Sequence, residues 1–331
     1  MTTANPMTQL YKRLSSEVGI SRNFVREKIL PEWWDDRAAI NPAGYAEAIG
    51  YISRSLSLDL QSLLPDRQIQ WASHRVSKFK HAAKVSEDQL AVAQAIATRV
   101  AELAVHMAAE PYKVIPQSAQ AIRNDILASG ASWVALDNLL DYCWSHGIPV
   151  VPVTQFPNHT RKMDGLATCA DGRPAIVISK VSKHSSWLLF VLAHELGHIA
   201  LGHLNKHAVV VDTKVEPDSK DSDEEAANRF ANELLAGDPV IRYTAAKYLR
   251  ADELAAAAQK RGQEDKVYPG VIALNYAWHR EFFAVGNAAL NLIEPNTLPL
   301  RVMHARLLKN INLERLPDES GEYLLRMVQP E

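Results

Sequence analysis

The stretch LLFVLAHELGHIALGH, from Leu188 to His203, constrains the fold of this chain more than any other feature. Its apolar residues are dense enough for a helix in a protein core, yet His194, Glu195 and His198 stand in its middle. Ionisable side chains inside an apolar helix are costly unless something pairs with them. The stretch therefore predicts a buried helix whose polar side chains share a partner.

The spacing within HELGH indicates that this partner is a metal ion. His194 and His198 are four residues apart, so on a helix they lie on one face. Both imidazoles can then bind a single Zn²⁺. Glu195 lies beside them, where it can act as general base on a water that the zinc acidifies. This arrangement is typical of zinc metallopeptidases.

A catalytic zinc site takes three protein ligands and keeps one position open, so a third ligand is required. The longer pattern HExxHxxGxxH does not apply, because Leu204 stands where its last histidine would be. His203 is expected to point away from the two ligands on a regular helix. The best third ligand is Glu224 in the next predicted helix, with Asn228 one turn later to support a histidine. Glu225 is the alternative, since a register error of one residue exchanges the two.

Length and pattern predict the fold class and its division into domains. A chain of 331 residues exceeds what one core usually supports. We expect a helical N-terminal region over 1–114, a zincin-like metallopeptidase core over 115–245 and a helical C-terminal region over 246–331. LATCADGRPAIVIS predicts a hairpin with an Asp-Gly turn, and Ser185 and Ser186 are expected to cap the zinc helix. The predicted class is α+β, mostly helical, with a small β-sheet in the core.

Composition predicts the cellular location of the protein and argues against general binding to membranes or nucleic acid. The chain has only two cysteines, Cys143 and Cys169, too few for a disulfide framework. Its first residues resemble no signal peptide, and its apolar runs are short for a membrane span. A net charge of −2 gives no general attraction to nucleic acid. We therefore expect a cytoplasmic protein without a membrane partner.

HELGHIALGH followed by EEAANRFANELL resembles the ImmA/IrrE family of metallopeptidases, over roughly residues 115–280. The resemblance implies that His194, His198 and Glu224 bind zinc and that Glu195 is the catalytic base. It also implies cleavage of a helix-turn-helix repressor, which derepresses stress, prophage or mobile-element genes. Family members often read E-x-E-A-N where this chain reads E-E-A-A-N, so the choice of Glu225 stays open.

Two segments of the N-terminal region are candidates for contact with nucleic acid. Residues 10–30 resemble a helix-turn-helix, and an ordinary helical hairpin is the alternative. The stretch QWASHRVSKFKHAAK mixes basic residues with Trp71 and Phe79, as a surface that binds phosphates and stacks bases would. It suggests a nucleic-acid activator, with a solvated basic face as the alternative.

Further residues are candidates for supporting roles at the zinc site. A thiolate at Cys169 can cap the metal, although a small residue buried in a strand is the simpler interpretation. Tyr268, Tyr276 and His279 are candidates for stabilising the oxyanion. The competing class of function is a non-catalytic DNA- or protein-binding regulator with a structural zincin core. The intact Glu195 favours the enzyme.

Overall fold

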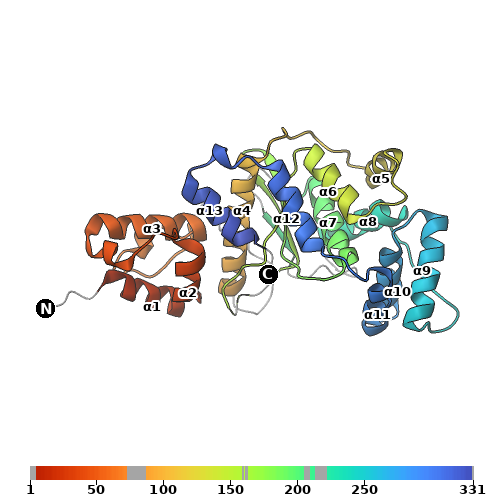
Figure 1. Ribbon diagram of the computed structural model, residues 1–331, viewed down its shortest axis with the longest axis horizontal. Helices are drawn as coiled ribbons and strands as arrows, with labels where there is room; N and C mark the ends of the chain where they lie inside the picture. The colour runs from red at the N-terminus through yellow and green to blue at the C-terminus, as the bar shows by residue number, and fades with distance from the viewer. Residues whose placement is uncertain are drawn as a thin grey trace.

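The computed structural model describes residues 5–72, 87–158, 160, 163–204, 209–212 and 222–329 (Figure 1). The N-terminal part holds α1 (Pro6–Val18), α2 (Arg22–Phe24), α3 (Pro42–Leu56) and α4 (Glu87–Met107). The central part holds α5 (Ala119–Ala128), α6 (Leu136–Ser145), β1 (Val150–Pro152), β2 (Gly165–Ala170), β3 (Arg173–Ile178), α7 (Ser185–Ala200), β4 (Val209–Asp212) and α8 (Ser222–Ala236). The C-terminal part holds α9 (Ala251–Asp265), α10 (Pro269–His279), α11 (Phe283–Ile293), α12 (Pro299–Asn310) and α13 (Asp318–Val328).

The strands form one mixed sheet in the order β1-β3-β2-β4. β1 runs parallel to β3, whereas β2 is antiparallel to both of its neighbours. β2 and β3 are joined by a tight turn in which Asp171 and Gly172 both have positive φ, 50° and 78°. Such a turn matches the twist of a hairpin, so the Asp-Gly hairpin predicted from the sequence is confirmed.

Helices cover both faces of this sheet. Along β3, Ala175 and Val177 join the core that contains α4, whereas Ile176 and Ile178 join the core that contains α7. Alternate strand residues point to opposite faces, so the sheet is buried between two helical layers. This three-layer arrangement is α+β in class, as predicted.

Helix α4 is apolar along most of its length, because it lies between the sheet and the N-terminal helices. By length and composition alone its residues Leu90–Met107 could cross a membrane, but most of that stretch is buried inside the protein. Its side chains form a common core with α1, α3, α13 and one face of the sheet. The predicted domain boundary near residue 114 stays a prediction, although α4 packs on the sheet of the central part.

The segment that resembles a helix-turn-helix is a helical hairpin at one end of the molecule (Figure 1). α1 ends at Gly19, which has a φ of 72°, and the Ser21 side chain accepts a hydrogen bond from the first turn of α2. Arg22 and Arg26 each lie 3.2 Å from the Asp36 carboxylate. Both guanidinium groups thus pair with one carboxylate, while the Arg22 side chain stays largely exposed, and the resemblance to a helix-turn-helix stays a prediction. The basic-aromatic stretch after Trp71 lies almost entirely outside the described residues.

Candidate metal centre

Helix α7 carries both histidines of HELGH in the interior of the protein. Leu189, Leu192 and Leu196 on this helix are fully buried, and so are the His194 and His198 side chains. The two Nε2 atoms lie 3.0 Å apart, because a spacing of four residues puts both rings on one face of the helix. The apolar side chains thus fix α7 in the core and aim two nitrogen ligands at one point.

The third side chain at this point is Glu224, in the first turn of α8. Its Oε2 lies 3.4 Å from His194 Nε2, and its Oε1 lies 3.5 Å from His198 Nε2. One ligand atom from each of the three residues can be chosen so that all lie within 4.8 Å of one another. Glu225 instead lines a neighbouring pocket and is exposed. Geometry therefore groups Glu224, rather than Glu225, with the histidines.

The glycine of HELGH lets α8 approach closely enough for this contact. A Cβ on Gly197 would lie 3.1 Å from Phe230 Cδ1 and 3.3 Å from Ala227 Cα. Glycine inside a helix costs about 1 kcal/mol relative to alanine. Close packing of α7 against α8 is the physical reason for accepting that cost here.

Asn228 fixes the orientation of His194, as the sequence predicts for a supporting residue. The Asn228 Oδ1 lies 2.9 Å from His194 Nδ1, and both side chains are buried. An amide oxygen only accepts, so His194 donates its Nδ1 proton to Asn228. The Nε2 lone pair of His194 is then directed at Glu224 and at any metal bound there.

His203 fixes the second histidine, and the expectation that it points away is wrong. α7 ends at Ala200, and Gly202 adopts a φ of 74°, which turns the chain back. The His203 N–H donates to the His198 carbonyl at 2.9 Å, and the two Nδ1 atoms lie 2.9 Å apart. A metal bound at Nε2 would leave the His198 proton on Nδ1, from where it would be donated to His203. A glycine after the predicted helix end was the available sequence signal for this turn.

Glu195 is completely buried between α7 and strand β2. The space that it occupies exists because residue 165 of β2 is a glycine. A Cβ on Gly165 would overlap the Glu195 carboxylate and lie 2.8 Å from its Cδ. Sequence reasoning did not single out Gly165, because its role depends on a strand that lies against α7 only in the folded protein.

The N-terminus of α7 is held by a carboxylate from the far end of the chain. Glu294 accepts hydrogen bonds from the Ser186 backbone N–H at 3.3 Å, from the Ser186 hydroxyl and from Tyr268. Burial of this carboxyl raises its pKa. The expectation that Ser185 or Ser186 caps the helix is wrong, since the N-cap residue is His184, which makes no side-chain cap hydrogen bond.

The other residues that the sequence suggested for the site, two tyrosines, a histidine and a cysteine, lie at different places around the centre. Tyr268 bonds Glu294, and the Tyr276 hydroxyl accepts a hydrogen bond from Leu249 N–H at 3.1 Å. His279 lines a pocket next to Asn228 and is the candidate of the three that faces this side of the centre. Cys169 is four residues beyond Gly165 on β2, about 13 Å along the strand. Burial also raises the pKa of its thiol, so a thiolate cap on the metal finds no support in the structure.

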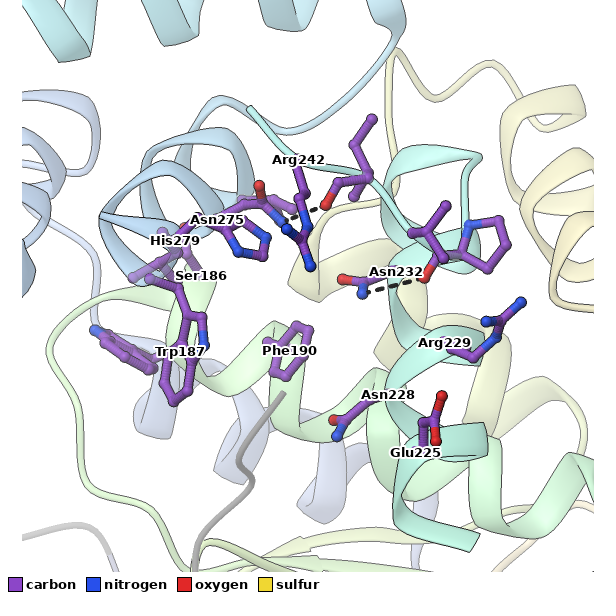
Figure 2. A pocket seen from close by; sticks show the side chains of 16 residues that line it. Ser186, Trp187, Phe190, Glu225, Asn228, Arg229, Asn232, Arg242, Asn275 and His279 are labelled. Carbon is purple, nitrogen blue, oxygen red and sulfur yellow. Dashed lines mark hydrogen bonds between the residues drawn. The ribbon is translucent and has the colours of Figure 1, made fainter. Parts of the chain in front are cut away.

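A pocket lies along the α7–α8 side of the centre (Figure 2). Its volume is about 220 Å³, and its walls come from α7, α8, the segment 239–242 and α10. Phe190 and Trp187 form one wall, and Asn228, which holds His194, borders it. Asn228 thus contacts both the pocket and the His194 ring.

One comparison with known proteins identifies a family. Residues 143–261 match the sequence model of the IrrE N-terminal-like domain, a family of peptidases. The match runs from α6 into α9 and so contains every residue of the candidate centre, but it is shorter than the expected span of 115–280. No curated protein and no solved structure shows a significant match to the chain.

Proposed function

Residues 143–261 belong to the IrrE N-terminal-like peptidase family, and from this premise we propose that the chain is a cytoplasmic zinc-dependent endopeptidase. The observation that carries the proposal is the convergence of His194, His198 and Glu224 on one point within 4.8 Å, beside the buried Glu195. A metallopeptidase needs these two parts together, a three-ligand metal site and a general base.

The donor set fits a zinc ion. Two imidazole nitrogens and one carboxylate form a common ligand set of catalytic zinc, and both histidines are oriented through Nδ1. The two Nε2 atoms and the Glu224 carboxylate oxygens lie close together, so one divalent ion between them could accept a ligand atom from each residue. When bound, zinc supplies a Lewis acid that acidifies water and polarises the peptide carbonyl.

Glu195 supplies the proton transfers in this mechanism. Its carboxylate takes a proton from the attacking water and delivers it to the nitrogen of the leaving amine. The group lies directly against Gly165, where no side chain intervenes. Its complete burial excludes bulk water from the group, so its proton transfers take place within the site.

The resemblance to ImmA/IrrE peptidases supports a helix-turn-helix transcriptional repressor as the substrate. Its cleavage would derepress stress, prophage or mobile-element genes. Regulation by nucleic acid through the basic stretch 70–84 is the second part of this proposal, supported by its mixture of basic and aromatic residues.

The test is incubation of the zinc-loaded chain with any helix-turn-helix repressor that is encoded beside its gene, with the fragments read by mass spectrometry. We expect a single cut by the wild type and a rate at least about 100-fold lower for Glu195→Gln, which cannot take the proton. Glu264→Gln, on the exposed face of α9, is the matched control and should cut normally. A Glu195→Gln protein that cuts at the wild-type rate would end the assignment of the base. A wild type that binds zinc but cuts nothing would favour the non-catalytic regulator.

A further inference from the structure

The pocket beside the metal centre is called the side pocket here, after its place next to His194 (Figure 2). Its position follows from the two helices that carry the ligands. Phe190 lies one turn before His194 on α7, and Asn228 lies one turn after Glu224 on α8. Residues four apart share a helix face, so the walls of the side pocket continue the surfaces that hold the metal ligands.

Half of the residues that line the side pocket are apolar. They include Phe190 and Trp187 from α7 and Val271, Leu274 and Trp278 from α10. A volume of about 220 Å³ has room for a large aliphatic or aromatic side chain. A group of that kind would leave water and gain contact with the aromatic rings in the lining.

Polar side chains hold the pocket in shape. Asn275 accepts a hydrogen bond from Tyr243 N–H at 2.9 Å and donates one to the Ile241 carbonyl at 3.1 Å. These two bonds fasten the segment 239–242, which lines the pocket, to α10. A preformed pocket does not spend ligand affinity on ordering its own walls.

The charges that border the side pocket disfavour a basic ligand. Arg242 directs its guanidinium into the cavity, opposite Phe190 (Figure 2). Arg229 and Glu225 stand at the edge formed by α8. Two guanidinium groups against one carboxylate repel lysine or arginine side chains, whereas an uncharged side chain meets no such penalty.

We propose that the side pocket binds a bulky apolar side chain of the substrate, on a residue that flanks the scissile bond. This inference rests on the proposed peptidase function, because the metal centre defines where the scissile bond lies. Successive residues of an extended peptide are about 3.8 Å apart, so a residue next to the cleaved bond can reach a pocket that begins behind His194. The side pocket would then decide which bonds the enzyme cuts.

Binding of small hydroxamates to the zinc-loaded chain tests the pocket separately from catalysis. Acetohydroxamate reports on the metal alone, whereas 3-phenylpropanohydroxamate adds a phenyl group that can enter the side pocket. We expect the phenyl compound to bind about 10- to 100-fold more tightly by calorimetry, as burial of a large apolar group implies. Equal affinities would overturn the inference while leaving the metal site intact. Failure of both compounds to bind would remove the proposed zinc site, and the inference with it.

Variants that fill the pocket locate the binding site of the phenyl group. Leu274→Trp, from α10, should abolish the extra affinity of the phenyl compound, and Asn232→Phe, from α8, should do the same if the first variant unfolds. Leu292→Trp is the matched control, because Leu292 is exposed on α11 and lies outside the pocket lining. If the filled variants keep the full difference between the two hydroxamates, the phenyl group binds elsewhere and the inference is wrong.

Discussion

At the scale of single residues, the centre depends on which of two adjacent glutamates faces the histidines. Glu224 lies 3.4 and 3.5 Å from their Nε2 atoms, whereas Glu225 lines the side pocket. We expect wild type to hold about one zinc per chain, with Glu224→Ala losing most of it and Glu225→Ala keeping it. Metal analysis after dialysis gives the measurement, and His194→Ala is the positive control. Loss of zinc from Glu225→Ala instead would move the third ligand by one position.

Gly165 leaves room for the Glu195 carboxylate, a role that becomes visible only in the folded structure. Its backbone φ is not in the left-handed region, so alanine would ordinarily be tolerated there. A Cβ at this position would nevertheless displace the Glu195 carboxylate. We predict that Gly165→Ala keeps its zinc but loses about 100-fold or more in cleavage rate. Adding Glu195→Asp, with its shorter side chain, should restore part of that rate. A Gly165→Ala enzyme of normal rate would show that Glu195 has room to move.

At the scale of helices, Arg123 holds three elements together from the interior. Its guanidinium donates to the carbonyls of Leu235 at 2.8 Å and Lys266 at 2.7 Å, at the ends of α8 and α9. Last-turn carbonyls need such partners when they are buried. Arg123→Leu should lower the free energy of unfolding by about 3 kcal/mol, measured in urea. Arg261→Leu, which removes an exposed ion pair on α9, should lower the stability far less. Similar losses in both variants would contradict this interpretation.

The anchoring of α7 by Glu294 should give stability a particular dependence on pH. Burial raises the pKa of this carboxyl above its unfolded value of 4.5, so the folded state prefers the protonated form. The contribution of Glu294 to stability is therefore full below pH 4.5 and is lost as pH rises through the folded pKa. Relative to Glu294→Gln, which cannot ionise, wild type should lose stability as pH rises from about 4 to 8. Urea unfolding of both proteins across this range gives the difference in their free energies of unfolding at each pH. A difference that stays constant, or that changes in favour of the wild type as pH rises, would refute the prediction.

At the scale of the whole molecule, a bound metal would join the two helices that flank the centre. Bound zinc would be held by groups from both α7 and α8, so its removal should destabilise the protein. At a free zinc concentration 1,000 times the Kd, this linkage is worth about 4 kcal/mol. We expect EDTA to lower the Tm by roughly 10 °C in scanning calorimetry, and added zinc to restore it. Glu224→Ala should show no shift with EDTA, and a shift in that variant would place the zinc elsewhere.

The sequence by itself indicated which residues form the candidate centre, because its signals are local. The spacing of His194 and His198 needs only a helix to put both rings on one face, and the same holds for Glu224 and Asn228 one turn apart. The Asp-Gly turn between β2 and β3 is equally local, since its backbone conformation follows from those two residue types.

Only the tertiary structure decided which distant groups complete and support the centre. Gly165 lies against Glu195, and Glu294 reaches Ser186 across 108 residues, because packing of separate elements brings them together. His203 returns to His198 through the turn at Gly202, which breaks the helical periodicity used to place it. A spacing such as four residues relates side chains within one helix, but no such spacing relates residues of separate elements that pack together. The positions of such partners follow from the fold and not from the order of residues along the chain.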